Sequence, residues 1–261
     1  MRKGEVFWGG LLILAGLLFL AGNVWGFSAW QFIWPLFLIA IGAWVLWSTL
    51  RGPGDVETES LSFPLEEESE ARIHIQYGAG RLSIDGDAAP GLLMEGDFAG
   101  GVRHSRRQVG ERTELRLRAS EEFWTWVPWS SSPRDWRLHL ANEIPLRLKV
   151  EAGANEAKLD LRQLRVVALD IDTGASSTDV WLPESAGQTR VDIDSGAASV
   201  VLRVPDNVAA RIETEVALSS VNVDQQRFPR SGKIYESPGY ASAENRVEIH
   251  AEGGVGSLTV R

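Results

Sequence analysis

The chain has 261 residues, no cysteine and a formal net charge of −9 at pH 7. This length allows one large domain or two small ones. The negative charge disfavours nucleic acid as a partner and disfavours general adhesion to anionic lipid. The absence of cysteine excludes disulfides and a cysteine nucleophile, and it agrees with a reducing compartment.

The N-terminal part carries an apolar run, because residues 6–50 contain no Asp, Glu, Lys or Arg. A spanning helix needs about 20 apolar residues, so this run is long enough for two. The turn residues at 22–28, "GNVWGFS", divide it into predicted helices over about 6–22 and 29–50. The sequence therefore predicts a two-helix transmembrane region over residues 1–52. A cleaved signal peptide is the alternative, and the second apolar segment argues against it.

Positive charges near the two predicted helices set their expected orientation. Arg2 and Lys3 precede the first helix and Arg51 follows the second, whereas the turn between them is uncharged. The positive-inside rule then predicts a multi-pass protein of the cell membrane with a cytoplasmic C-terminal domain. Gly9 and Gly16 lie seven residues apart on one face of the first helix. We expect them to pack against another helix, because small residues allow close approach in lipid.

The rest of the chain is acidic, with a net charge of −11 over residues 55–261. Residues 53–70 are predicted to be an acidic linker, and residues 71–261 an all-β repeat domain. An insert over residues 88–145 interrupts the repeats.

Internal repeats predict the architecture of the soluble part. "IHIQYGAGRLSI" at 73–84 is similar to "IHAEGGVGSLTV" at 249–260, and four further copies lie between them. Gly153, Gly174 and Gly196 are 21 and 22 residues apart, and each is flanked by alternating apolar residues. This pattern predicts strand, bend, strand, stacked as a β-solenoid-like array of about 21-residue repeats. A sandwich of ordinary hairpins is the alternative.

The repeat register also predicts which side chains form columns. Two inward columns are expected, one of Val150, Ile171, Ile193 and Thr214 and one of Leu159, Val180, Leu202 and Val223. An outward column is acidic: Glu151, Asp172, Asp194, Glu215 and, beyond a further insert, Glu252. Stacked like charges repel, so this column is either a solvated face or a site facing a cation. No metal-binding motif with tight spacing accompanies it.

Four tryptophans lie within "FWTWVPWSSSPRDW", residues 123–136. Alternating segments before and after it predict two strands joined by a loop of about fourteen residues, far longer than a usual hairpin loop. Trp124, Trp126 and Trp129 are therefore candidates either for a cap on the open end of the stack or for an exposed anchor that binds a partner or a membrane.

Motifs for catalysis and for cofactor binding do not occur in the sequence. The four histidines are scattered, "SGKI" at 231–234 lacks the rest of a phosphate-binding loop, and the Gly-x-Gly at Gly78 opens no predicted helix. We therefore expect no enzyme activity and no cofactor.

Two stretches carry a family resemblance. Residues 7–47 resemble the LiaI–LiaF-type transmembrane region of bacterial envelope-stress proteins, and residues 145–183 resemble the β-repeat domain of LiaF-like and related adhesin-type, or toast-rack, proteins. The resemblance implies a membrane-anchored regulator that restrains a sensor histidine kinase until the envelope is damaged. It brings no catalytic residues.

Three functional hypotheses follow. The leading one is a non-enzymatic protein of envelope-stress sensing or signalling, whose β-domain binds a partner such as a sensor kinase. The second is a structural or adhesin-like module that self-associates at the membrane. The weakest is a carbohydrate-acting β-helix enzyme that would use its acidic columns.

Overall fold

The computed structural model describes residues 42, 58–120 and 135–261, and β-strands dominate the last two ranges. Its elements in chain order are β1 (Thr58–Pro64), β2 (Glu70–Asp85), β3 (Leu92–Ala99), β4 (Val102–Val109), β5 (Arg112–Ala119), β6 (Asp135–Leu140), β7 (Leu146–Asp160), β8 (Val166–Trp181), β9 (Gln188–Arg203), β10 (Ala209–Val223), β11 (Arg230–Ser231), β12 (Ile234–Glu236), the 3-10 turn η2 (Tyr240–Ser242) and β13 (Arg246–Val260).

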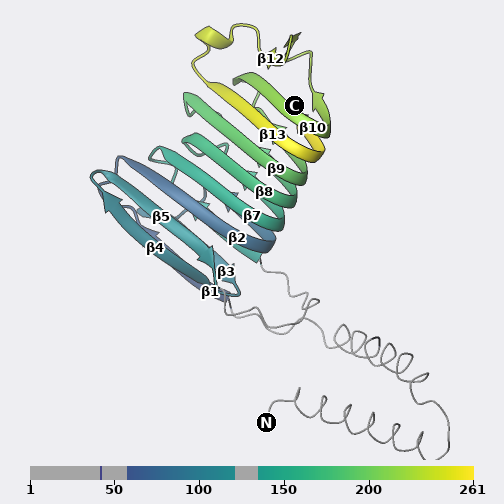
Figure 1. The fold of residues 1–261 in the computed structure, drawn as a ribbon. Coiled ribbons are helices and arrows are strands. Elements are labelled where there is room, and N and C mark those ends of the chain that lie inside the picture. Colours follow the sequence, from purple (N-terminus) through teal and green to yellow (C-terminus); the bar gives the residue numbers. More distant parts are fainter. Residues whose placement is uncertain (1–41, 43–57, 121–134) are drawn as a thin grey trace, which may run out of the picture. The chain divides into compact units, whose positions relative to one another are not determined.

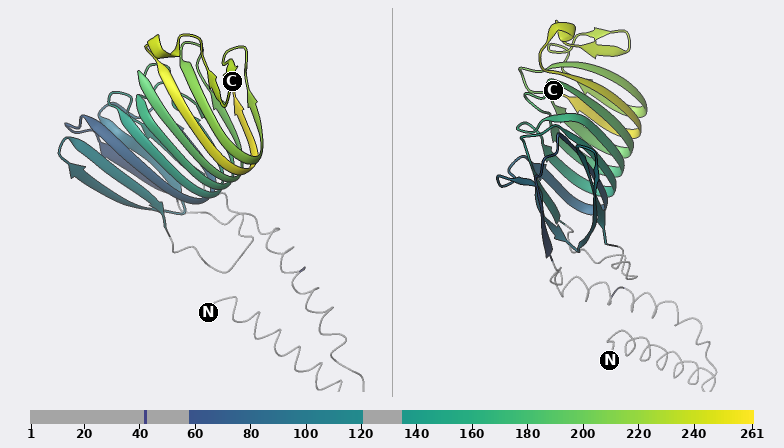
Figure 2. Two further views of the ribbon diagram at one scale, coloured as in Figure 1. Left: turned by 45° about the horizontal axis from the view of Figure 1, so that its top comes forward. Right: turned by 90° about the vertical axis from the view of Figure 1, so that its left-hand side faces the viewer.

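Six long parallel strands form the centre of the sheet, in the order β2, β7, β8, β9, β13, β10 (Figure 1). Each has 15 or 16 residues, well above the usual strand length of about 5–6. Each strand curves at its middle, so its two halves face each other across the core (Figure 2). We call the half before the bend the first arm and the half after it the second arm.

The inward columns predicted from the repeats are confirmed for β7, β8 and β9, but in β10 Thr214 is only half-buried, and β13 separates both Thr214 and Val223 from β9. Val150, Ile171 and Ile193 align across neighbouring first arms and are at most 3% exposed. In the second arms Leu159, Val180 and Leu202 align in the same way and are at most 1% exposed. Alternating apolar residues thus bury one face of each arm, and the two buried faces share one core.

Close contacts between neighbouring bends explain why several bends contain glycine. A Cβ atom added to Gly153 would lie 2.7 Å from the carbonyl oxygen of Gly78, and one added to Gly174 would lie 2.8 Å from that of Gly153. The same contact at Gly196 would be 2.9 Å from the oxygen of Gly174. These three bends therefore pack against the backbone of the neighbouring bend, which leaves no room for a side chain.

The order of the last two long strands differs from the order of the repeats in the sequence. Strand β13 lies between β9 and β10 and is parallel to both. Glu252, predicted to follow Glu215 in the acidic column, instead lies between Asp194 and Glu215. Repeats of similar pattern can occupy either place, so their sequence order alone does not fix their order in the sheet.

The insert over residues 88–145 completes the stack. Strand β5 pairs with the first arm of β2, and β6 pairs with the second arm. The two segments flanking the tryptophan-rich stretch are strands, as predicted, but they do not form a hairpin. They share one level of the stack, since β5 pairs with residues 70–76 of β2 and β6 pairs with residues 81–85. Strands β4, β3 and β1 then extend this end, and β1 lies within the predicted linker segment.

Aromatic side chains close both ends of the core. At the β6 end, Trp136 is 1% exposed, and its ring centroid is 4.9 Å from that of Phe98 and 5.1 Å from that of Tyr77. At the β10 end, Phe228 and Tyr235 are buried. Both come from the segment between β10 and β13, which also adds β12 to the first residues of β10.

The predicted fold class needs a correction in its helical part. Within residues 58–120 and 135–261, no helix has the length and apolar character needed to cross a membrane. The described structure is instead a β-sheet protein with a single short 3-10 turn. The two-helix region predicted over residues 1–52 lies outside the described residues, apart from Gly42.

Candidate functional site

The outward side chains of the first arms form three rows that cross eight strands, in the order β4, β5, β2, β7, β8, β9, β13, β10. The strand register aligns the members of each row. We call this surface the first-arm face. The row nearest the bend consists of Arg103, Arg118, Gln76, Glu151, Asp172, Asp194, Glu252 and Glu215. The middle row consists of Ser105, Arg116, His74, Lys149, Asp170, Asp192, His250 and Glu213. The row farthest from the bend, the far row, consists of Arg107, Glu114, Arg72, Arg147, Ala168, Arg190, Glu248 and Arg211.

The predicted acidic column is therefore part of a larger pattern. Glu151, Asp172 and Asp194 align directly across β7, β8 and β9, as the repeat register predicts. The same row continues on the other side of β7 to Gln76, Arg118 and Arg103, where its charge changes sign.

Strands β4, β5, β2 and β7 carry the basic half of the first-arm face. Its three rows hold seven arginines and lysines against two glutamates, a net charge of +5. Arg106 does not belong to this surface, because its guanidinium points under β4 to the fully buried carboxylate of Glu68 at 2.7 Å. Thr113 also donates a hydrogen bond to Glu68, at 3.1 Å, so this carboxylate is a structural contact.

Strands β8, β9, β13 and β10 carry the acidic half. Its three rows hold eight aspartates and glutamates against two arginines, a net charge of −6 with histidine neutral. Arg190 offsets Asp192 at 2.7 Å, and hydrogen bonding to that carboxylate raises the pKa of Arg190. Among the described residues, no hydrogen bond or ion pair reaches the carboxylates of Asp172 or Asp194.

Glu151 stands at the boundary between the two halves. Lys149 Nζ lies 2.8 Å from its Oε1, and Gln76 donates a hydrogen bond to its Oε2 at 2.7 Å. The hydrogen bond from Lys149 is the main reason that the pKa of Glu151 falls to about 2, with Gln76 next in importance. His74 Nε2 adds a third contact at 3.0 Å, which becomes an ion pair when the imidazole is protonated.

A hollow of about 410 Å³ opens on the first-arm face next to this boundary. Its cationic lining comes from β2, β5 and β7, namely Arg72, Arg116, Arg147 and Lys149. Ala168 on β8 contributes only a methyl group to the far row, which leaves space beside Arg147. Carboxylates also line the hollow, at Glu114 and Asp170. Each of its four cations has an ion-pair partner in the chain: Glu114 for Arg72 and Arg116, Glu70 for Arg147, and Glu151 for Lys149.

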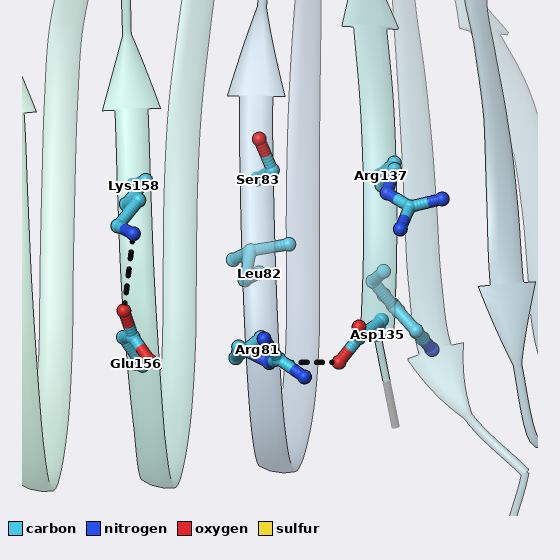
Figure 3. Close-up of a pocket in the computed structure, with 8 residues that line it drawn as sticks. Arg81, Leu82, Ser83, Asp135, Arg137, Glu156 and Lys158 are labelled. Atoms are coloured by element: carbon cyan, nitrogen blue, oxygen red, sulfur yellow. Dashed lines mark hydrogen bonds and ion pairs between the residues drawn. The ribbon is translucent and has the colours of Figure 1, made fainter. Parts of the chain in front are cut away.

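The outer face of the second arms differs in that charges of both signs lie side by side. Figure 3 shows a shallower hollow of about 150 Å³ on β6, β2 and β7. There Arg81 meets Asp135 at 3.2 Å, and Lys158 meets Glu156 at 3.2 Å. The row that contains Asp135, Arg81 and Glu156 continues beyond β7 without charge, as Ser177, Ser199, Ser257 and Ser220.

Trp181 is a surface feature that the repeat pattern did not single out. It is 38% exposed, and the guanidinium carbons of Arg162 and Arg203 each lie 4.7 Å from its ring centroid. Asp160 and Asp179 hold these arginines by two hydrogen bonds each, which lower the pKa of both carboxyls. Trp181 and Arg203 are 22 residues apart, and equivalent positions of neighbouring repeats lie side by side, so the repeat register aligns them although it does not by itself indicate the stacking.

The remaining predicted site residues do not come together in the described structure. Trp124, Trp126 and Trp129 lie outside the described residues, as do Gly9 and Gly16. Over residues 58–120 and 135–261, no group of three or more His, Asp or Glu side chains is arranged to hold a metal ion. The first-arm face is thus the candidate site.

Curved stacks of long strands of this kind define a class of β-repeat domain. Residues 52–203, more than half of the chain, match the family described as the N-terminal domain of toast_rack, DUF2154. The chain belongs to this family.

Comparison with solved structures shows the same fold in a protein of low sequence identity. A "putative cell adhesion protein" from Clostridium sporogenes is 21% identical, with a TM-score of 0.73, over 79% of this chain and 99% of that chain. A "putative adhesin" from Bacteroides fragilis is 9% identical, with a TM-score of 0.29, over 80% of this chain and 99% of that chain. A third, a "putative adhesin" from Parabacteroides distasonis, has 10% identity and a TM-score of 0.18, over 80% and 98% of the two chains. A search of curated proteins found no match.

Proposed function

We propose that this protein is a non-enzymatic, adhesin-like binding module of the bacterial cell envelope, and that its first-arm face binds a protein partner. The family match and the fold of the Clostridium sporogenes cell adhesion protein support a module of this kind. Partner binding of this sort needs no catalytic group.

One observation carries the proposal, the separation of charge on the first-arm face. The same strands present a net +5 half and a net −6 half on one arm, whereas positive and negative side chains alternate in the second-arm hollow. Ion pairs within the chain offset part of the first-arm charge, and the remaining like charges repel one another within each half. Complementary potentials across an interface give specificity and fast association.

The resemblance to LiaF-like proteins supports a finer role. Under it the partner is a protein of envelope-stress signalling, such as a sensor histidine kinase, and the β-domain works at the cell membrane on its cytoplasmic side. A cytoplasm-active reporter fused after Arg261 should then function, and an export-dependent reporter should not. The reverse result would favour an adhesin-like role outside the cell.

Charge reversal on the two arms tests the binding proposal directly. Full-length protein is crosslinked in cells and recovered with its partners. We expect Arg116→Glu/Arg118→Glu on the first arm to reduce the amount of captured partner protein at least tenfold. The matched change Arg137→Glu/Lys158→Glu on the second arm makes the same change in net charge and should leave capture unchanged. Equal capture by both variants would refute a role for the first-arm face.

A further inference from the structure

We propose that the second arm of β10 accepts an extended segment of another protein as an added strand, and that this segment alternates apolar with small uncharged residues and ends in a basic one. β10 is the last of the long strands in the stack (Figure 1). Its second arm pairs with β13 over Leu218–Val223. On the other side of these residues, no strand within 58–120 or 135–261 pairs with it. We call this side the open edge.

Other edges of the sheet carry features that discourage pairing with a further strand. β4 exposes the charged side chains of Arg103 and Arg107. The register of β1 against β3 shifts at Pro64, where β1 ends. The first residues of β10 are covered by β12. The open edge has none of these features, because residues 216–223, "VALSSVNV", contain no charge, proline or glycine.

Backbone groups of two valines point to the open edge. Asp224 N donates a hydrogen bond to the carbonyl oxygen of Val260 on β13 at 3.0 Å. In a parallel ladder, alternate residues direct both their N–H and their C=O to the same neighbour. Asn222 therefore faces β13, whereas Val221 and Val223 face the open edge. In the described part of the chain, no hydrogen bond meets the backbone of either valine on that side. Such groups are a template for one more strand.

The inward side chains at this edge are incompletely covered. Val221 belongs to an inward column that continues to Leu258 on β13 and Val200 on β9. Leu258 is 5% and Val200 3% exposed, whereas Val221 is only half-buried. An added strand that points apolar side chains inward would cover Val221 and extend the column by one level.

The pattern of β13 shows what kind of segment pairs with this arm. Its last residues, "GSLTVR" at 256–261, point Leu258 and Val260 inward, and Arg261 stands level with Asp224. Asp224 forms no ion pair with any described residue, so a second basic side chain can face it from the open edge. A segment of the same pattern therefore matches the backbone, the inward column and the charge of this edge.

A peptide tests the proposal. The probe has the sequence of residues 256–261, with blocked ends and a fluorescent label, and is mixed with the full-length chain in nonionic detergent. We expect saturable binding, measured by fluorescence anisotropy up to millimolar protein. A control peptide has proline in place of Thr259. In a parallel strand added at the open edge, that residue directs its N–H to β10, so binding should weaken about tenfold while the apolar side chains stay the same.

Exchange of charge identifies the edge. Asp224→Lys should weaken binding of the probe about threefold, and a peptide with glutamate in place of Arg261 should restore it. Asp87→Lys makes the same change in net charge at an exposed position on another part of the chain and should bind the probe like the wild type. The first-arm variant Arg116→Glu/Arg118→Glu should also bind like the wild type. Thermal unfolding will show that each variant keeps the fold.

Absence of saturable binding to the wild type, or equal binding of the probe and the proline peptide, would overturn the proposal. Equal weakening by Asp87→Lys and Asp224→Lys would show a general effect of charge and overturn it as well. Loss of binding in Arg116→Glu/Arg118→Glu would place the probe on the first-arm face, away from the open edge. Because the open edge and the first-arm face are tested by different variants, failure here leaves the proposed function standing.

Discussion

The inner and outer faces of the first arms are built by the same strands in the same register, yet the inner face repeats its chemistry more regularly than the outer face. Along the inner column, Val150, Ile171 and Ile193 are interchangeable apolar residues. One residue earlier in each strand, the outer column changes from Lys149 to Asp170 and Asp192. Close packing constrains the inner face, whereas solvent leaves the outer face free to carry function.

Truncation of an inner side chain should cause the largest loss of stability. Ile193 is 3% exposed, so Ile193→Ala should reduce the free energy of unfolding by about 2–5 kcal/mol. Its neighbour Asp192 points outward, and Asp192→Ala should cost less than about 1 kcal/mol. Denaturant unfolding of both variants measures the contrast, and equal losses would mean that the outer face also holds the stack together.

Adding a methyl group to a glycine at the bend should cause the next largest loss of stability. Gly174→Ala forces a Cβ atom to 2.8 Å from the carbonyl oxygen of Gly153, and we expect a loss of about 1–3 kcal/mol. Gly78→Ala is the matched control, because nothing lies within 4 Å of its added Cβ. Its effect should stay within about 0.5 kcal/mol. Similar losses at both positions would show that the bend is limited by backbone conformation instead of by contact between neighbouring bends.

Acid should destabilise the boundary at Glu151. Its pKa is about 2 in the folded chain against an ordinary value of 4.5, so its contribution is present above pH 4.5 and is lost as the pH falls through 2. Glu151→Gln should lower stability at pH 7 by about 1 kcal/mol, a value reduced by solvent screening, and should flatten the profile in that window. Thermal unfolding at successive pH values tests this. Asp172→Asn, which removes no hydrogen bond, is the control, and a profile for Glu151→Gln as steep as the wild type would contradict the assignment.

The smallest effect is expected from calcium. Bound ligand stabilises a fold by mass action, but Asp172 and Asp194 belong to an open acidic row without the geometry of a metal site among the described residues. Millimolar calcium should therefore change the free energy of unfolding by less than about 0.5 kcal/mol. A larger change that disappears in Asp172→Asn/Asp194→Asn would show that the outer face binds cations.

Periodicity in the sequence was sufficient to predict the inner columns and the bend, because packing repeats the same chemistry at each level of the stack. It also aligned Glu151, Asp172 and Asp194 on one face. The predicted position of Glu252 was wrong, because repeats of similar pattern can occupy either place in the sheet and their pattern does not determine their order.

The basic half of the first-arm face was not predicted, for a different reason. Arg103, Arg116 and Arg118 come from the insert, which lacks the repeat pattern, and only the pairing of β4 with β5 and of β5 with β2 brings them onto the same face as the acidic row. A net charge of −9 for the whole chain also hides a basic surface, because totals do not show how charge is distributed.

The place of β13 has a consequence for how the chain is made. Synthesis produces β10 before β13, although β13 separates β10 from β9 in the finished sheet. Until the residues from Arg246 to Val260 have emerged from the ribosome, β9 and β10 both expose unpaired edges, and pairing them directly with each other would close the stack with one level missing. To reach the final sheet, the place between β9 and β10 has to stay unfilled until β13 has been synthesised.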